Sequence, residues 1–557
     1  MSSQVSALSE RRWADRLSVH VGLLGCVLLV LLCSAELRNG FSVDEGSYAI
    51  QAHALRDGSW DIHWPLRSLD PEGRYFPYDA GRLTADGAVA YVSHPAWPAA
   101  LAVTTSAFGE LIGLRVLSLL SVFVAAITGF FMASTLAGRA AAPWGFWLVG
   151  ASPLLVNGLM IWAHAPGIAL GGLAALAAMR VLEGSSRRWP WLVLPTALSA
   201  GVLVRGESLP FALALLAALI VFGFRRQHRK LLMLASLGAV AISLAYALER
   251  IWITSIIGTE LGTELGYGLS ERAGSDDGWV VGRLLGATVV LILGGVSALT
   301  LWTTLTALLL VGLAVRASGR PDVRVRPTPL LFGAGGLMVV RLFVGVEETV
   351  YGLLVAWPLA LLALIAVKEG RSTHRLLGLI GGLFLVGVLV TQSDVGGGSQ
   401  WGGRFLSPIL VPLGALMAAA VVSSRFRIVE RQAIAAVALT CALASVVITE
   451  ERRRINARGM DLIADTGART ALTKSNLFAR LDWREWPERC WLAANDDLPG
   501  ALAVLRQVGG GKSAYLGFSA LELRRAGARV TVADPQLKIG AFQLSRSAIT
   551  DCPSPGG

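Results

Sequence analysis

Two adjacent carboxylates, Asp44 and Glu45, follow the first long apolar run of the chain. A carboxylate at a water–lipid boundary can accept the proton of an incoming hydroxyl group, so Asp44 is a candidate general base and Glu45 its catalytic neighbour. Ser42 and Glu45 also have the spacing of a helix capping box, so Glu45 can equally well mark the start of a helix. His53 lies eight residues after Glu45 on nearly the same helix face, and is either a substrate contact or a partly exposed surface residue.

Basic residues at the ends of other apolar runs are candidates for anion or substrate binding. Arg205 and Glu207, in the segment LVRGE, either neutralise one another or leave Arg205 to bind an anion at the membrane surface. His94 precedes Pro95 where another apolar run begins. It is a weaker candidate for substrate binding, because Pro is favoured in the first turn of any helix.

The loop 392–408 (QSDVGGGSQWGGRFLSP) is the other strong chemical feature. Its five Gly allow the backbone to move or to approach a ligand closely. The guanidinium of Arg404 presents a fork of N–H groups that matches phosphate. Gln400 and Trp401 stand beside it and are expected to contact the substrate. The alternative is a flexible loop with an interfacial Trp and Arg.

Aromatic residues are frequent between residues 60 and 91. They are explained either by an aromatic belt at the membrane interface or by stacking on sugar rings, and the sequence leaves both open. The residues are Trp60, Trp64, Tyr75, Tyr78 and Tyr91.

The composition of the chain indicates that membrane-spanning helices position these residues. Of 557 residues, 54% are hydrophobic and only 16% are charged, whereas soluble proteins carry about 25% charged residues. This excludes an ordinary soluble enzyme and a disordered protein, and predicts a polytopic membrane protein. The net charge of +11 is explained by Arg in cytoplasmic loops rather than by nucleic-acid binding.

The apolar runs predict an all-α membrane domain, 1–449, with about 13 transmembrane helices. The first helix, about Val19 to Leu37, is expected to be retained, and a large extracytoplasmic loop, 38–113, follows it. The stretch 280–315 is interpreted as a surface or re-entrant helix followed by one span. Basic segments alternate with the runs and are assigned to the cytoplasm. They lie at 139, 183–189, 225–230, 316–326, 368–375 and 425–431.

The last 108 residues, 450–557, are soluble in composition and predict a small extracytoplasmic α/β domain. Strands are expected at 491–495 and 528–534, and helices at 497–507 and 519–527. The segment GGGKS is not a phosphate-binding P-loop, because Arg506 stands where that motif needs Gly. Cys490 and Cys552 are expected to pair if this domain lies outside the cell.

Four segments together resemble the GT-C superfamily of polyprenyl-phosphate-sugar-dependent glycosyltransferases. The similarity is greatest to its protein-mannosyltransferase-like, aminoarabinose-transferase-like and RgtA/B/C/D-like groups. Ala96 replaces the second Pro of the family's His-Pro-Pro, and Gly403 replaces the Pro of its Trp-Gly-Pro-Arg. Asn157 and His164 stand where the family has a polar luminal turn. The segments are Asp44-Glu45, SHPAWP with FGELIGLR (93–115), LVRGE (203–207) and QWGGRFLSP (400–408).

The resemblance implies an enzyme of the cell inner (plasma) membrane with an extracytoplasmic active site. It would transfer a sugar, with inversion, from a polyprenyl-phosphate donor to a glycan, lipid or protein acceptor, and would bind no nucleic acid. Asp44 maps to the family's base and Arg404 to the basic residue near the donor phosphate. Arg205, His94 and His53 map more loosely. A divalent metal is an open point, for which Asp44, Glu45 and His53 offer a partial ligand set.

Two other functions compete with this interpretation. A transporter or flippase of lipid-linked saccharides would place polar groups near the membrane midplane, whereas the acids and glycines here gather at one face. A non-catalytic scaffold would tolerate replacement of Asp44.

Overall fold

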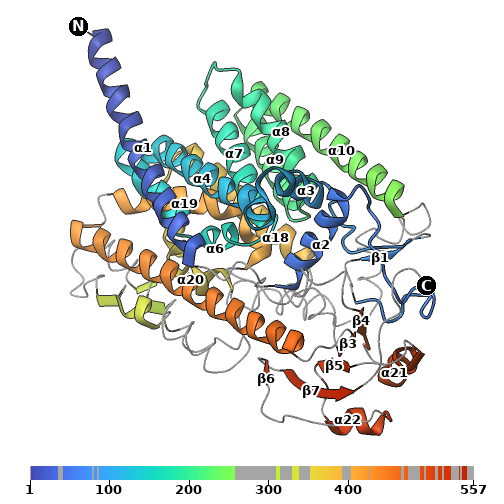
Figure 1. Cartoon of the computed structure of the whole chain (residues 1–557). Coiled ribbons are helices and arrows are strands. Elements are labelled where there is room, and N and C mark those ends of the chain that lie inside the picture. Colours follow the sequence, from blue (N-terminus) through green and yellow to red (C-terminus); the bar gives the residue numbers. More distant parts are fainter. Residues whose placement is uncertain are drawn as a thin grey trace, which may run out of the picture. The chain divides into compact units, whose positions relative to one another are not determined.

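The structure is a computed structural model of the chain, shown in Figure 1. It describes residues 2–34, 42–77, 81–84, 87–226, 228–257, 306, 309–310, 312–313, 329–330, 332–337, 352–391, 403–423, 426–465, 470–474, 490–494, 497–507, 512–516, 518, 520–527, 538–539 and 542–548.

The chain divides into two compact units, which are described one at a time. Unit 1 comprises Met1–Ala35, Leu117–Leu248 and Gly268–Ile448, and unit 2 comprises Glu36–Val116, Glu249–Tyr267 and Thr449–Gly557. The sequence predicted a division into a membrane domain, 1–449, and a C-terminal domain, 450–557, and this division stays a prediction. Contacts within the chain group the first loop with the C-terminal segment.

Seven helices among the described residues are long and apolar enough to cross a membrane, as expected of a multi-pass membrane protein. The count of 13 stays a prediction, and the ambiguous stretch 280–315 lies almost entirely outside the described residues. The seven are α4 (Glu110–Ala137), α7 (His164–Leu182), α9 (Ser208–Arg225), α10 (Arg229–Ile257), α18 (Ser372–Thr391), η4 with α19 (Arg404–Val422) and α20 (Ile428–Asp465).

The remaining elements complete unit 1, and most pack into the same apolar core. Figure 1 shows α7, α8 and α9 side by side, and Gly238 of α10 contacts Leu194 of α8 and Leu216 of α9. These elements are α1 (Ser2–Ser34), η1 (Arg139–Ala141), α5 (Ala142–Gly150), α6 (Leu154–Gly158), α8 (Trp189–Val204), α16 (Leu353–Ala356), η3 (Pro358–Leu362) and α17 (Ala363–Glu369).

Glycines set the closest helix contacts of unit 1. Gly129 of α4 and Gly145 of α5 lie against each other's backbone, and Gly414 of α19 lies against Val149 of α5. A side chain at any of the three would collide with the facing helix. Such small-residue contacts are the usual way for helices to pack in lipid, where the hydrophobic effect does not hold them together.

The spans of unit 1 have two distinct ends. Gly387 near the end of α18 contacts Pro210 near the start of α9, so these two helices are antiparallel. Gly167 near the start of α7 contacts Ser208 at the start of α9. One end therefore holds the starts of α7 and α9, and the other holds the start of α18.

The described part of the first loop folds on α2 (Val43–Arg56), which packs against α3 (Ala96–Phe108) in unit 2. The Gln51 side chain donates to the Trp60 carbonyl at 2.7 Å and accepts from the Ala90 N–H at 3.0 Å, which ties both arms of the loop to the helix. Between these arms lies a two-stranded ribbon of β1 (Arg82–Leu83) and β2 (Ala88–Val89).

The aromatic residues of this loop have a structural role that neither sequence interpretation included. Trp64 packs edge-on against Phe76, and Tyr91 packs edge-on against Tyr48. Trp64, Tyr75 and Tyr91 are buried, so they belong to the core of the unit rather than to an exposed belt or a stacking surface. Tyr78 lies outside the described residues.

The C-terminal segment forms a five-stranded mixed sheet in the order β4-β3-β5-β7-β6. The expected strand at 491–495 and the two expected helices are confirmed as β4, α21 and α22, whereas 528–534 lies outside the described residues. The bounds are β3 (Thr470–Thr473), β4 (Cys490–Ala493), α21 (Leu498–Gln507), β5 (Lys512–Leu516), α22 (Ala520–Arg525), β6 (Lys538–Ile539) and β7 (Phe542–Ala548).

The C-terminal segment tests three details that were predicted from the sequence: its first residue, the P-loop and the disulfide. Helix α20 continues to Asp465, so the expected boundary at 449/450 falls within a helix. Lys512 begins strand β5 rather than a helix, which agrees with the rejection of a P-loop. Cys490 is disulfide-bonded, and its expected partner Cys552 lies outside the described residues.

Candidate functional site

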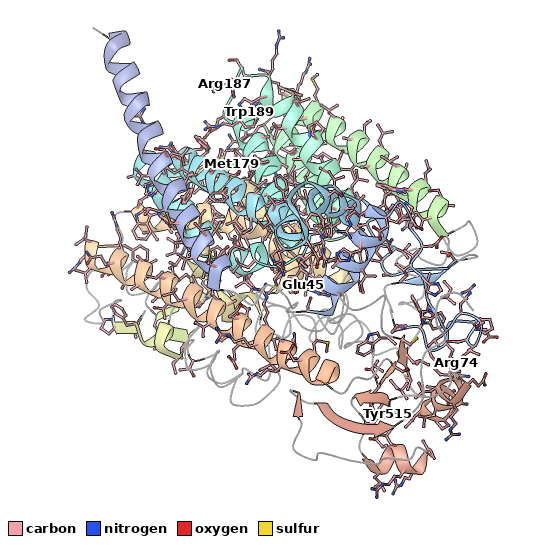
Figure 2. All side chains as sticks on the ribbon, in the orientation of Figure 1. Glu45, Arg74, Met179, Arg187, Trp189 and Tyr515 are labelled. Atoms are coloured by element: carbon pink, nitrogen blue, oxygen red, sulfur yellow. The ribbon has the colours of Figure 1, made fainter. Side chains whose placement is uncertain are left out.

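The start of α2 carries the predicted acidic pair of unit 2. Ser42 has an extended backbone, and its N–H donates to Glu45 Oε2 at 3.1 Å, as a capping box requires. Glu45 is fully buried at this helix start, where Figure 2 labels it, whereas Asp44 is only partly buried. Glu45 is thus engaged in starting the helix, and Asp44 is the more accessible carboxylate. The catalytic role of either stays a prediction.

His94, expected only as a substrate contact, forms a buried pair with Glu249 of α10 within unit 2. His94 Nδ1 lies 2.6 Å from Glu249 Oε1, and both side chains are less than one-tenth exposed. The pair is ionic when His94 is protonated, and a neutral His94 with its proton on Nδ1 keeps the hydrogen bond. Either form holds the imidazole in a fixed orientation.

The backbone of His94 is strained. Its φ is +71°, and it is the single non-glycine residue with positive φ among the residues that the structure describes. A left-handed conformation costs a residue with a side chain about 1–2 kcal/mol. Such strain gathers at functional sites, which fits the assignment of His94 to a site.

Arg205 and Glu207 form the corresponding buried pair of unit 1. They occupy the short turn between α8 and α9, and Arg205 Nη2 donates to Glu207 Oε1 at 2.8 Å while Nε faces the other carboxylate oxygen. One hydrogen bond and a close ionic contact therefore join the two side chains. Glu207 balances the charge of Arg205, and whether Arg205 also binds an anion stays a prediction.

His164, at the start of α7, lies near the two predicted arginines of unit 1. It is fully buried, and the charges of both Arg205 and Arg404 act on it. Ser208 follows the Arg205 turn and lies 3.4 Å from the position that a Gly167 Cβ would occupy on α7. The structure thus gathers residues from three separate segments, named here the His164 cluster: His164, Arg205, Glu207, Ser208 and Arg404.

Arg404 reaches this cluster through a turn at Gly403. Gly403 has φ +60°, which Pro cannot adopt because its ring holds φ near −65°. The exchange of the family's Pro for Gly therefore changes the backbone that leads into Arg404. The Arg404 guanidinium lies 5.1 Å from the centre of the Phe405 ring, and the residue is buried. Gln400 and Trp401 lie outside the described residues.

Several buried polar groups at this end of unit 1 lack a hydrogen-bond partner within the described part of the chain. They include both ring nitrogens of His164, the hydroxyl of Ser208 and the whole side-chain amide of Asn157. Buried polar groups are nearly always paired, so a group of exceptions indicates a place for water or a polar ligand. The His164 cluster supplies permanent positive charge and unused donors at the same place, as phosphate binding requires.

Metal use was left open by the sequence. Within the described ranges, no three His, Cys, Asp or Glu side chains lie close enough to hold an ion together. His53 is partly buried on α2.

The sequence analysis missed two residues of these sites. Glu249 carries a charge within the long apolar segment that forms α10, and such a charge is a functional signal by itself. Ser208 gave no signal, because a hydroxyl at a helix start is ordinary. Ser208 is a candidate site residue because it is buried and its hydroxyl has no hydrogen-bond partner among the described residues.

Comparison with known proteins identifies the fold. No protein-family profile matches the sequence, and no curated protein matches it significantly. Among solved structures, ArnT from Cupriavidus metallidurans bound to undecaprenyl phosphate matches with TM-score 0.54 at 13% identity, over 94% of this chain and 97% of that chain. The archaeal oligosaccharyltransferase AglB from Archaeoglobus fulgidus, in complex with an inhibitory peptide and a dolichol-phosphate, gives TM-score 0.46 at 11% identity, over 89% of this chain and 69% of that chain.

The ArnT match confirms the GT-C fold that the sequence motifs predicted. At this identity the likeness extends to the fold alone. One fold can support many activities, so the function must be argued from the sites.

Proposed function

We propose that the protein is an integral membrane glycosyltransferase. It moves a sugar from a polyprenyl-phosphate donor to an acceptor of the cell envelope, at the outer face of the inner membrane. The observation that carries this proposal is the His164 cluster, which places buried positive charge and unpartnered donors at one end of the spans of a GT-C fold. ArnT, a solved structure of this fold, holds undecaprenyl phosphate.

The proposed reaction needs one base and a stabilised leaving group. Asp44 takes the proton of the acceptor hydroxyl, whose oxygen attacks the anomeric carbon from the face opposite the phosphate. The bond between that carbon and the phosphate oxygen breaks, the electron pair goes to the phosphate, and the sugar configuration inverts. Polyprenyl phosphate is already a good leaving group, so no general acid is required.

In this proposal Arg404 supplies the charge that stabilises the departing phosphate, and Arg205 shares that role to a smaller extent because Glu207 balances it. Ser208 and His164 contribute hydrogen bonds to the phosphate oxygens. The end of the spans that carries the His164 cluster lies away from the basic segments, and the positive-inside rule places it outside the cytoplasm.

The test is transfer of radiolabelled sugar from polyprenyl-phosphate donors, with mannose, glucose and arabinose compared, in membranes that contain equal amounts of folded protein. Asp44→Asn is expected to lower the rate about 10²–10⁴-fold, as loss of a general base does. Arg404→Ala is expected to lower it about 10²–10³-fold, as loss of transition-state charge stabilisation does. The matched control is Asp57→Asn, which changes an exposed carboxylate just after α2.

Each other result has a distinct meaning. Equal transfer by wild type and Asp44→Asn would show that the base lies elsewhere. If wild type transfers no sugar but moves a lipid-linked saccharide across vesicles, the protein is a transporter and the glycosyltransferase proposal is wrong.

A further inference from the structure

Unit 1 contains a cavity of about 590 Å³ at the opposite end of the spans from the His164 cluster. It lies among the last turn of α4, the end of α17, the start of α18 and the end of α19. Since α18 starts at this cavity and its last turns lie near the start of α9, the two places are separated by about the length of this helix, roughly 30 Å. The polar lining residues are Ser134, Thr135, Arg371, His374 and Ser423.

His374 marks this cavity as a binding site. Its side chain is only 7% exposed, and its Nδ1 has no hydrogen-bond partner within the described ranges. Gly370, which also lines the cavity, lies directly against His374, so the imidazole is held in place by the segment that leads into α18. The ring thus lines the cavity while its buried Nδ1 has no partner among the described residues, as expected where a polar ligand or water completes the site.

The charged residue that lines this cavity is basic, and Glu183 after α7, an acidic group within electrostatic reach of it, lies outside the lining. Arg371 stands one residue before α18, is exposed, and acts electrostatically on His374. The start of α18 adds the partial positive charge and the free N–H groups of a helix N-terminus. No Asp or Glu is among the residues that line the cavity. The lining therefore favours an anion and disfavours a cation.

The rest of the lining indicates what carries the anion. Leu136, Ile365, Ala366 and Ala419 give the cavity an apolar wall, and no Phe, Tyr or Trp lines it, so a nucleotide base would find no ring to stack on. The cavity lies at the ends of helices that are long enough to cross a membrane. A phosphate attached to an acyl glycerol matches both the polar and the apolar part.

We propose that this cavity binds the phosphate group of an anionic phospholipid, with Arg371 and His374 as its ligands and with acyl or glycerol carbons against the apolar wall. The same end of unit 1 carries the basic segments 225–230, 368–375 and 425–431, so the lipid belongs to the leaflet that the positive-inside rule makes cytoplasmic. This site is separate from the proposed donor site and does not depend on it. A free phosphate has the same chemistry, and the experiment separates the two sources.

The experiment titrates the full-length protein in detergent with phosphatidylglycerol and counts bound lipids by native mass spectrometry. Phosphatidylcholine and inorganic phosphate are titrated in parallel. Wild type is expected to retain one phosphatidylglycerol in preference to phosphatidylcholine, and Arg371→Ala to bind it about tenfold more weakly, as loss of one charge-assisted hydrogen bond predicts. Arg371 is exposed, so its replacement leaves the core intact.

Arg375→Ala is the matched control, because Arg375 is exposed on the same helix but does not line the cavity. It is expected to bind phosphatidylglycerol as wild type does, and His374→Gln is expected to bind more weakly. An equal loss for Arg371→Ala and Arg375→Ala would reduce the effect to surface charge and overturn the proposal. Binding of inorganic phosphate without preference for phosphatidylglycerol would overturn the assignment to a lipid.

Discussion

The described part of each unit contains a buried carboxylate paired with a basic side chain, but the two pairs are built differently. Arg205 and Glu207 of unit 1 are neighbours in one turn, whereas His94 and Glu249 of unit 2 are 155 residues apart. A guanidinium keeps its charge at any pH that a protein meets. The carboxylate of unit 1 therefore balances a permanent charge, whereas the carboxylate of unit 2 meets a single ring nitrogen.

The difference predicts how damaging the loss of each carboxylate is, because a permanent charge left buried without its partner is costly. Four predictions test this contrast, from the largest expected effect to the smallest.

Removal of the unit 1 carboxylate should be the most damaging change. Glu207→Ala leaves the Arg205 charge buried without its partner, and is expected to lower the free energy of unfolding by about 3–5 kcal/mol. Denaturant unfolding in a fixed detergent, followed by Trp fluorescence, measures it. Glu183→Ala is the control, because Glu183 is partly exposed and 3.8 Å from Arg180, and it should cost less than about 1 kcal/mol.

The corresponding change in unit 2 should cost less. Glu249→Ala removes a buried partner of His94 but leaves no guanidinium charge without a partner, so the expected loss is about 1–3 kcal/mol in the same unfolding measurement. If Glu249→Ala costs as much as Glu207→Ala, the proposed contrast between the two pairs is wrong.

A pair of variants at His94 isolates its backbone strain. His94→Ala and His94→Gly both remove the contact with Glu249, but only Gly adopts φ +71° without a steric penalty. His94→Gly should therefore be more stable than His94→Ala by about 1 kcal/mol. The reverse order would show that the positive φ does not persist in solution.

A partly buried pair in unit 2 extends the comparison toward the surface. Asp497 accepts a hydrogen bond from the Tyr75 hydroxyl at 2.8 Å and lies 3.2 Å from Arg74, which Figure 2 labels in the first loop. The Tyr75 hydrogen bond, the Gly500 N–H and Arg74 lower the pKa of Asp497 from its ordinary value of 3.8. A carboxylate whose pKa is lowered in the folded protein stabilises the fold at pH values above its ordinary pKa. This stabilisation is lost as the pH falls from the ordinary pKa through the lowered one.

Wild type should therefore lose a small amount of stability as the pH drops below about 4, in unfolding curves recorded across that range. Asp497→Asn should lack this part of the pH dependence. Tyr75 has the opposite sign: burial and Asp497 raise the pKa of its hydroxyl, so the fold should lose stability above about pH 10. If Asp497→Asn loses as much stability at low pH as wild type does, the loss comes from other carboxylates.

Local features of this molecule were predictable from the sequence. The Ser42–Glu45 cap, the Arg205–Glu207 pair and the helix at 497–507 depend on residues a few positions apart, so their spacing alone determines them. Alternation of apolar runs with basic segments predicted the multi-pass membrane architecture for the same reason.

Features that join distant segments were not predictable. Glu249 meets His94 only because α10 and the first loop fold together in unit 2, and no spacing records that contact. Strand β3 pairs in parallel with both β4 and β5, and its four residues carry too short a pattern to be recognised alone. The aromatic residues of the first loop looked like surface residues, because burial depends on partners such as Phe76 that lie elsewhere in the loop.

The close contacts of Gly414 with Val149 and of Gly172 with Val411 have a consequence for the helix bundle itself. Helix α19 follows the turn η4 that contains Arg404 and ends just before Ser423 of the cavity, and Val411, Ala415 and Leu416 along it are buried. A larger side chain at Gly414 or Gly172 would push α19 away from α5 or α7. These two glycines therefore fix the spacing of three helices, and their replacement would loosen the centre of unit 1 without touching any charged side chain.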